Sequence, residues 1–436
     1  MFLALATPGF MPSERSILPR HLRVELEDAL TYSRVVSIIG ARQVGKTTLV
    51  RDIMQTGRFI TLDDATTLDA IENDPWEELK TLRAELEDAP LIVDEAQRSH
   101  QLPLAIKRIV DLDDRPGQFV ITGSSNIFTS SHVTDSLAGR LLTLTLWPLT
   151  VAETMSRGPS TILDWAVSGS PDLRELPTPQ RLDRMAYVDL ILRGGYPNIR
   201  NLQRRKRQRV YREYVHTIVD RDVADIVRVR KTDALRRLID QLAVRTASEL
   251  NIAELCSLIG VRRSTVNQYL DVLLRLSLVF KLGAWTSGET RREIKNAKYH
   301  FADTGVAAAL RHLTTRSFGV DGDPAALGGL AESFVFSEIL RAAPHQENDF
   351  RFHHWRDQRG REIDILAESG YRLVAIEVKA SSAAGRADFR HLDWFATVGP
   401  GKTRTMTSIL FYLGERMLSF GGRRYALPVS CLWGAV

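Results

Sequence analysis

The chain is poor in cysteine: its 436 residues include only Cys256 and Cys431. Neither cysteine has a neighbour at the spacing of a zinc site, and two cysteines cannot form a disulfide framework. Such sparing use of cysteine is typical of a reducing compartment, so we expect a cytoplasmic protein. The sequence also lacks an apolar run of about 18 residues, the length that a membrane-spanning helix needs. These absences predict a protein without structural disulfides, cysteine-bound zinc or a membrane partner.

The sequence shows no internal repeat and no low-complexity tract. Its apolar start, residues 1–6, lacks a basic segment and is too short for the apolar core of a signal peptide. The composition is that of a globular protein, with 44% apolar and 25% charged residues. The length allows about two to four domains. The net charge of +5 permits an anionic partner without requiring one, so local clusters of basic residues matter more.

The strongest motif is GARQVGKT at 40–47, which follows a β-branched run at 34–39 and precedes a predicted helix. Strand, G-x-x-x-x-G-K-T and helix together form the P-loop in its required context. The glycines let backbone N–H groups face phosphate oxygens, the lysine reaches the β- and γ-phosphates, and the threonine hydroxyl binds Mg²⁺. The alternative, a chance glycine-rich turn, fits the flanking strand and helix less well. The predicted cofactors are ATP and Mg²⁺, and the predicted ATP-binding residues are Gly40, Ala41, Arg42, Gln43, Val44, Gly45, Lys46, Thr47 and Thr48.

A second apolar run, within APLIVDEAQ at 89–97, brings Asp94 and Glu95 to the end of a predicted strand. This pattern is typical of a Walker B motif. Asp94 would hold Mg²⁺ together with Thr47, and Glu95 would orient and polarise the attacking water. The alternative is an acidic pair that caps the helix that follows. With a P-loop upstream, the sequence favours Asp94 as a metal residue and Glu95 as a catalytic residue beside Lys46.

The next buried strand, 118–126, should lie beside the P-loop strand and ends in polar residues. We expect one of Thr122, Ser124, Ser125 and Asn126 to contact the γ-phosphate, and Ser124 is the candidate. Arg140, before a fifth strand, is a candidate catalytic guanidinium that would neutralise charge on the γ-phosphate. It could equally be a surface arginine that binds a nearby carboxylate. Action in trans would require a homo-oligomer, whereas action in cis would not.

Several further motifs follow in a fixed order: ITGSSN, SLAGRLLTLTLWPLT, GGYP at 194–197 and YREYVHTIVDRDVADI at 211–226. With the P-loop and Walker B segments, they make nearly the whole chain resemble the AAA-type ATPases of bacteria and archaea that carry a poorly characterised C-terminal region. The resemblance implies an ATPase core, a helical connector, a winged helix and a nuclease-like end domain. We therefore predict an α/β fold with a parallel P-loop sheet. The predicted domains are an ATPase core at 1–155, a helical insertion and connector at 156–240, a winged helix-turn-helix at 241–295 and a PD-(D/E)xK (restriction-endonuclease-like) domain at 296–436.

The middle of the chain contains basic segments. Residues 156–186 are weakly periodic and predict a flexible insertion. The amphipathic helix that follows opens on a basic block, which is either a solvated face or a contact for a phosphate backbone. The block comprises Arg204, Arg205, Lys206, Arg207 and Arg209.

Residues 248–282 predict a helix-turn-helix: a helix, a turn at Gly260, a second helix capped by Ser264, and an apolar strand that begins a wing. Such folds contact DNA through the start of the second helix, but they also serve as dimerisation or packing modules. Basic residues there would bind phosphates, and the amide side chains could read a base. The predicted nucleic-acid contacts are Arg262, Arg263, Thr265, Asn267 and Gln268.

The predicted end domain carries Glu332 on a helix, then Asp364, Glu377 and Lys379 on strands, in an order that resembles the PD-(D/E)xK nuclease fold. Asp364 and Glu377 would share a divalent ion, with Glu332 as an outer ligand. Lys379 would be catalytic, orienting the attacking water or stabilising the transition state. The alternative is a binding scaffold without cleavage, because this fold often persists in that form.

The sequence thus predicts an ATP-binding, Mg²⁺-dependent ATPase that acts on nucleic acid, with DNA favoured over RNA, and metal-dependent nuclease activity as a further expectation. The alternative is a nucleotide-dependent switch, or a protein that binds an unknown protein partner, whose C-terminal domain is an inactive scaffold.

Overall fold

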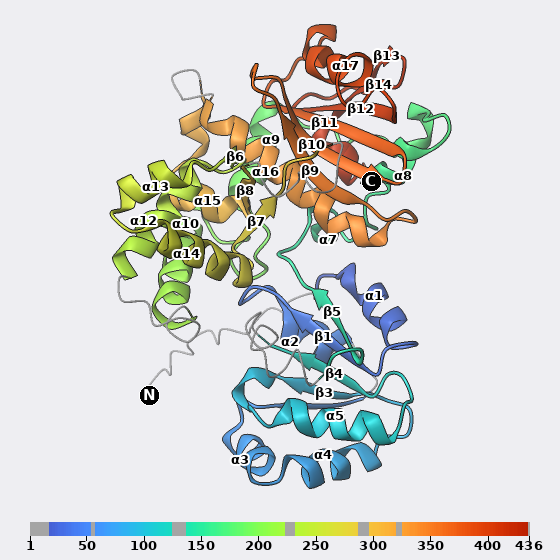
Figure 1. Cartoon of the computed structure of the whole chain (residues 1–436), viewed down its shortest axis with the longest axis vertical. Helices are drawn as coiled ribbons and strands as arrows, with labels where there is room; N and C mark the ends of the chain where they lie inside the picture. Colours follow the sequence, from blue (N-terminus) through green and yellow to red (C-terminus); the bar gives the residue numbers. More distant parts are fainter. Residues whose placement is uncertain are drawn as a thin grey trace, which may run out of the picture.

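The computed structural model describes residues 17–53, 57–123, 137–222, 232–286, 296–319 and 325–434. Figure 1 shows three regions: a sheet with its helices at the bottom, a mainly helical region at the upper left, and a larger sheet at the upper right. The candidate sensor Ser124, with Ser125 and Asn126, lies outside the described residues.

The N-terminal region is built on a five-stranded parallel sheet in the order β2-β3-β4-β1-β5. Strand β4 lies between β1 and β3, as the sequence predicted for the strand after the Walker B motif. The strands are short apolar runs because helices cover both faces of a parallel sheet. They are β1 (Val35–Ile39), β2 (Arg58–Thr61), β3 (Leu91–Asp94), β4 (Phe119–Thr122) and β5 (Leu141–Thr145).

Alternate residues of β1 enter two different cores, because successive side chains of a strand point to opposite faces. Val35 packs with α3, α4 and α5, whereas Val36 and Ile38 pack with α1. The helices of this region are α1 (Leu22–Ala29), α2 (Lys46–Thr48, continued by a π-helical turn at Leu49–Ile53), α3 (Ala65–Asn73), α4 (Pro75–Ala84) and α5 (Leu102–Leu112).

The middle region combines helices with a small antiparallel sheet in the order β6-β8-β7. Two of the helices, α13 and α14, are joined at Gly260, whose φ of 75° ends α13. The sequence predicted that Ser264 caps α14. The N-cap is instead Arg262, and Ser264 lies in the first turn of the helix. The elements are α7 (Val151–Thr154), α8 (Ile162–Val167), α9 (Arg184–Arg193), α10 (Arg204–Thr217), α12 (Thr232–Val244), β6 (Ser248–Glu249), α13 (Ile252–Ile259), α14 (Arg263–Arg275), β7 (Val279–Leu282), β8 (Lys298–Phe301) and α15 (Thr304–Leu310).

The C-terminal region is a six-stranded mixed sheet in the order β13-β14-β12-β11-β10-β9. Helix α16 packs on one face, with Ile365 and Ile376, and α17 packs on the other, with Ile363 and Leu373. The elements are α16 (Ala325–Ala342), β9 (Arg351–Arg356), β10 (Glu362–Ser369), β11 (Arg372–Lys379), α17 (Arg390–Thr397), β12 (Thr405–Tyr412), β13 (Leu418–Gly421) and β14 (Arg424–Pro428).

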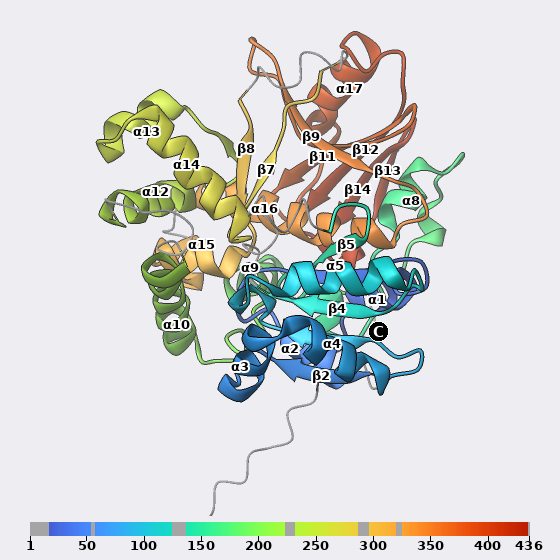
Figure 2. The same ribbon diagram turned by 60° about the horizontal axis from the view of Figure 1, so that its bottom comes forward.

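The segment 156–186 differs from the flexible insertion that the sequence predicted. Figures 1 and 2 both show α8 beside the C-terminal sheet. Thr407 Oγ1 donates a hydrogen bond to Ala166 O at 2.6 Å, and Tyr425 Oη donates one to Pro171 O at 2.8 Å. Trp165 is buried in the same contact. Most of the polar residues of the segment face solvent, whereas its apolar residues pack against the sheet.

The GGYP motif joins the N-terminal region to the helices that follow. Leu149 N donates to Gly195 O at 2.8 Å, and Gly195 N donates to Asp303 Oδ2 at 2.6 Å. The same aspartate caps α15 by accepting a hydrogen bond from Val306 N at 3.1 Å. A Cβ atom on Gly195 would lie 2.2 Å from Leu149 O. The glycine is therefore required by the close approach of two backbones.

We expect Gly195→Ala to destabilise the fold by about 1–3 kcal/mol, because the added methyl group overlaps the backbone at residue 149. Urea unfolding followed by circular dichroism measures the effect. Gly158→Ala is the control, since a Cβ there meets no heavy atom within 4 Å. Equal stability of the two variants would contradict the close approach.

Candidate functional site

The P-loop lies at the carboxyl end of β1 and adopts a conformation that needs glycine. Gly40 has a φ of 151° and Gly45 a φ of 100°, values that L side chains rarely adopt. A Cβ on Gly40 would lie 2.2 Å from Leu146 O, in the segment that follows β5. Lys46 is buried, and its Nζ lies 3.0 Å from both Gly40 O and Ala41 O. The side chain of the predicted phosphate-binding lysine thus folds back onto the backbone of the P-loop.

The other P-loop residues divide into an inner and an outer set. Ala41 and Val44 are buried against the core, whereas Arg42 and Gln43 are exposed. Thr48 is half-buried in α2, next to Thr47.

The two predicted magnesium residues are in direct contact. Thr47 Oγ1 donates to Asp94 Oδ2 at 2.9 Å, and the Thr122 hydroxyl donates to the other oxygen of Asp94. A hydroxyl and a carboxylate are the hard oxygen ligands that Mg²⁺ prefers. Strands β3 and β4 end at the same edge of the sheet. Thr122 therefore contacts the same carboxylate as Thr47, although the two residues are 75 positions apart in the sequence. The donor set fits a Mg²⁺–nucleotide.

Glu95 directly follows β3 and has a left-handed backbone, with a φ of 56°. Its carboxylate is hydrogen-bonded by the Gln97 side chain. A non-glycine residue in this conformation is uncommon and is found at functional sites more often than elsewhere. The conformation turns Glu95 away from the line of the strand, just beyond Asp94. The catalytic assignment of Glu95 stays a prediction that this position favours.

Arg140 lies at the opposite end of the sheet from the P-loop. Its carbonyl oxygen accepts a hydrogen bond from Val35 N, at the start of β1, whereas the P-loop begins where β1 ends, about 16 Å away. The guanidinium is paired with Asp111 on α5. A γ-phosphate role within the same chain does not fit this geometry, and the alternative of an arginine that binds a nearby carboxylate does. A role in trans stays a prediction.

Two buried side chains outside the predicted set hold the P-loop backbone. Arg20 donates to Val44 O at 2.7 Å and to Trp147 O at 2.6 Å, and it forms an ion pair with Glu153 at 3.1 Å. Tyr214, on α10, donates to Arg42 O at 3.1 Å. Neither residue belongs to a recognisable motif of the nucleotide site, so the sequence alone did not indicate these contacts. Both residues connect the loop to other parts of the chain.

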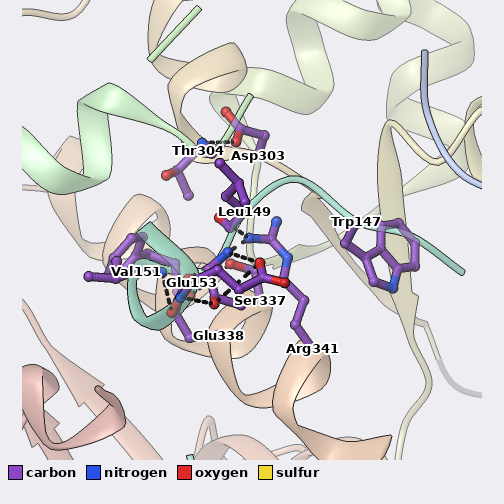
Figure 3. A network of polar contacts seen from close by, with 12 residues as sticks. Trp147, Leu149, Val151, Glu153, Asp303, Thr304, Ser337, Glu338 and Arg341 are labelled. Carbon is purple, nitrogen blue, oxygen red and sulfur yellow. Dashed lines mark hydrogen bonds and ion pairs between the residues drawn. The ribbon is translucent and has the colours of Figure 1, made fainter. Parts of the chain in front are cut away.

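Figure 3 shows the polar contacts at the joint between the nucleotide-binding core and α16. Val151 N donates to Glu338 Oε2 at 3.0 Å, and Arg341 donates to Leu149 O at 3.2 Å. Arg341 also donates to Ala302 O. Burial raises the pKa of Glu338 to about 7. The backbone that leaves β5 is therefore fixed to α16 by a buried carboxyl and a buried guanidinium.

The predicted nucleic-acid residues form the outer surface of α14. Arg262, Arg263, Asn267 and Gln268 are exposed and Thr265 is half-buried, whereas Val266, Tyr269 and Leu270 are buried. On α10, Arg204, Arg205, Lys206 and Arg209 are exposed. The fifth residue of that block, Arg207, instead turns inward and donates to Leu202 O at 3.1 Å. The structure thus separates a structural arginine from a basic surface.

The structure brings the predicted residues of the end domain together, but with a lysine that sequence reasoning missed. Lys298, on β8, has a side chain only 1% exposed, and its Nζ lies 2.8 Å from Glu332 Oε1. It also lies 2.5 Å from Glu362 Oε1 and 3.5 Å from Asp364 Oδ1. Burial alone would lower the pKa of Lys298, but Glu332, Asp364 and Glu362 raise it above its usual range. The ammonium group is thus charged and faces three carboxyl groups.

Glu377 and Lys379 pair with each other on β11. Lys379 Nζ lies 2.7 Å from Glu377 Oε1, and Val378 N donates to Asp364 Oδ2 at 2.9 Å. Burial and the nearby Asp364 raise the pKa of Glu377 to about 8, and the same two causes raise that of Glu332 well above its usual value. In the part of the chain that the structure describes, no group of three or more His, Cys, Asp or Glu residues has an arrangement that could hold a metal ion.

Comparison with family models divides the chain into three parts. Residues 32–155 match a model described as "AAA domain". Residues 184–317 match "Domain of unknown function (DUF8612)", and residues 327–432 match "Domain of unknown function (DUF4143)". The match over the P-loop and Walker B segments agrees with the geometry above. Residues 32–155 are an AAA-type P-loop domain.

Relatives of the whole chain are uncharacterized proteins. One from Mycobacterium tuberculosis is 28% identical over 367 residues, which cover 83% of this chain and 74% of that protein. One from Methanocaldococcus jannaschii is 22% identical over 354 residues, which cover 78% of this chain and 74% of that protein. The matches span both the P-loop domain and the C-terminal half, so the combination is shared by these proteins.

Solved structures with some likeness include P-loop ATPases. The Walker-type ATPase of Pyrococcus abyssi is 16% identical, with a TM-score of 0.39 over 70% of this chain and 99% of that one. A signal transduction ATPase with numerous domains from Pyrococcus horikoshii is 15% identical, with a TM-score of 0.27 over 76% of this chain and 48% of that one. Both TM-scores are low, so these likenesses support no argument about function. Among the described residues, no helix is long and apolar enough to cross a membrane.

We expect Glu338→Gln to flatten the pH dependence of stability. Because the folded protein keeps the Glu338 proton up to about pH 7 while the unfolded chain releases it near 4.5, the contribution is present below pH 4.5 and lost as pH rises to 7. The loss is at most about 3 kcal/mol. Glutamine keeps a side-chain oxygen for Val151 N and does not titrate.

Urea unfolding at pH 5 and pH 8 tests this expectation, with Glu347→Gln, at an exposed position, as the control. The wild type and the control variant should lose more stability between the two pH values than Glu338→Gln does. Parallel losses in all three proteins would show that Glu338 is not the titrating group.

Proposed function

We propose that the protein is a Mg²⁺-dependent ATP hydrolase that acts on nucleic acid, DNA foremost. The observation that carries the proposal is the direct contact between Thr47 and Asp94 at 2.9 Å, with Lys46 buried inside the loop above them. These are the groups that bind a nucleoside triphosphate with its metal in P-loop enzymes. The fit is chemical as well as spatial: backbone N–H groups and an ammonium for phosphates, and oxygen ligands for the metal.

Each group of the site has a distinct role in hydrolysis. The P-loop backbone and Lys46 would hold the β- and γ-phosphates in line for attack. Thr47 and Asp94 would hold Mg²⁺, which neutralises phosphate charge when it is bound. Glu95 would accept a proton from the attacking water. Its place directly after Asp94, in a strained backbone conformation, is what supports this assignment.

The support for nucleic acid as partner comes from the exposed start of α14. A helix that follows a tight turn and presents Arg262, Arg263, Asn267 and Gln268 to solvent offers both phosphate-binding and base-reading side chains. The exposed basic residues of α10 add a second positive surface. DNA is favoured because a short helix with this side-chain set fits the major groove of B-form DNA. Winged-helix recognition remains part of the proposal.

A second candidate is a nucleotide-dependent switch whose C-terminal domain is an inactive scaffold. The observation that favours it is Lys298, which ion-pairs with Glu332, Glu362 and Asp364. Metal-dependent cleavage needs these carboxylates for a divalent ion. The expected nuclease activity therefore has less support than ATP hydrolysis does. Action on nucleic acid does not require cleavage, because a DNA-binding ATPase can remodel its partner without cutting it.

We expect Lys46→Ala to lower the ATP hydrolysis rate by about 100-fold or more, because it removes the cation that faces the phosphates. Glu95→Gln should lower kcat by a similar factor while leaving nucleotide affinity within a few-fold of the wild type. A phosphate-release assay and binding of a fluorescent ATP analogue separate the two effects. The control is Lys80→Ala, an exposed lysine on α4. Hydrolysis that survives Lys46→Ala would refute the assignment.

We expect the double variant Arg262→Ala/Arg263→Ala to bind DNA more weakly. The slope of log Kd against log salt concentration should fall by about two, one for each phosphate contact that is lost. Fluorescence anisotropy with labelled duplex DNA at several salt concentrations measures both quantities. Arg275→Ala is the matched control, an exposed arginine at the other end of the same helix. An equal loss in the control would argue against a DNA-binding role for the start of α14.

A further inference from the structure

The carboxyl groups of Glu332, Glu362 and Asp364 form an acidic cluster in the C-terminal region, and the cation that they surround comes from a different sheet. Glu332 lies on α16, and Glu362 and Asp364 lie on β10, but Lys298 belongs to β8 of the small sheet. An ammonium group has three N–H donors, and here three carboxyl groups lie within 3.5 Å of its nitrogen. The donors and the acceptors match in number, with the side chain almost fully enclosed.

The position of Lys298 is fixed by the strand that carries it. Residues 298 and 300 point to the same face of β8, and His300 Nδ1 lies 3.2 Å from Ser333 Oγ on α16. The small sheet is also joined to β9, since His354 N donates to Gly283 O at 2.9 Å and Trp285 N donates to His354 O at 2.6 Å. The lysine therefore lies on a strand that is packed against α16, in a sheet that is hydrogen-bonded to β9.

A divalent ion and this ammonium group exclude each other. Mg²⁺ binds oxygens at about 2.0–2.1 Å and needs the carboxylates to face it, whereas Glu332 and Glu362 face Lys298. The second oxygen of Asp364 already accepts a hydrogen bond from Val378 N. Like charges a few ångströms apart in a buried site repel strongly. Between Glu332 and Glu362, a metal could enter only if the ammonium group left.

We propose that Lys298 is the permanent counter-ion of this cluster and takes the place of a divalent cation, so that the C-terminal domain is stable and functional without metal. Replacing Lys298 by an uncharged residue would leave the three carboxylates without a counter-ion, and their side chains would have to turn towards one another to bind a divalent cation in its place. The proposal concerns the C-terminal region alone and does not depend on ATP hydrolysis. It argues against metal-dependent cleavage by this domain.

The test uses the full-length, nucleotide-free protein and Mn²⁺, with bound ions counted by electron paramagnetic resonance. The wild type and Asp364→Asn should bind the same number of Mn²⁺ ions. Lys298→Met should gain one Mn²⁺ per chain, with at least tenfold higher affinity than any wild-type site, and should lose it in Lys298→Met/Asp364→Asn. Lys298→Arg, which keeps the charge, should gain none. The control is Lys281→Met, an exposed lysine on the adjacent strand β7.

A second measurement covers the case in which Lys298→Met does not fold. Wild type and Asp364→Asn are compared for Mn²⁺ binding and for cleavage of labelled DNA with Mg²⁺ or Mn²⁺. An Asp364-dependent ion or cleavage in the wild type would overturn the proposal, as would a folded Lys298→Met that binds no Mn²⁺. Absence of both in the wild type supports it. The ATPase rate, measured on the same samples, reports on the proposed function separately.

Discussion

The buried ionisable side chains of α16 are the constraint on which the arrangement of the three regions depends. Glu332, Glu338 and Arg341 are all buried on this helix, and a buried polar or charged group is costly unless it is paired or hydrogen-bonded. Each of them is bound by a different part of the chain: Glu332 by Lys298 of the small sheet, Glu338 by Val151 N, and Arg341 by the carbonyl groups of Leu149 and Ala302. One helix therefore fixes the nucleotide-binding core, the small sheet and the C-terminal sheet relative to one another.

The same network reaches the nucleotide site through the backbone that follows β5. Arg20 bonds both Val44 O in the P-loop and Trp147 O, two residues before Leu149. From the other side, the Tyr214 hydroxyl donates to Arg42 O and lies 2.9 Å from the hydroxyl of Tyr196, the tyrosine of the GGYP motif. A change of P-loop backbone on nucleotide binding would therefore disturb contacts that lead to α10 and α16. This is a physical route by which ATP could act on the proposed DNA-binding surface.

The sequence was informative where the determinants are local. The P-loop and the Walker B segment were predictable because strand, turn and helix signals follow one another within a few residues. Lys298 was not, because its carboxylate partners lie 34 or more residues away and only the packing of β8 on α16 brings them together. Arg140 was ambiguous because its role depends on which end of the sheet it occupies.

The most direct test of the account is the ATP hydrolysis rate of the purified full chain with and without duplex DNA. The central claim is that ATP turnover serves an action on nucleic acid, with the P-loop, α10 and the joint to α16 in mechanical contact. The account predicts that DNA raises the rate several-fold, that the rise is smaller when Arg262 and Arg263 are replaced by alanine, and that Lys46→Ala abolishes both rates. An intact ATPase rate that neither DNA nor RNA changes would contradict it and would favour a switch that acts on a protein partner.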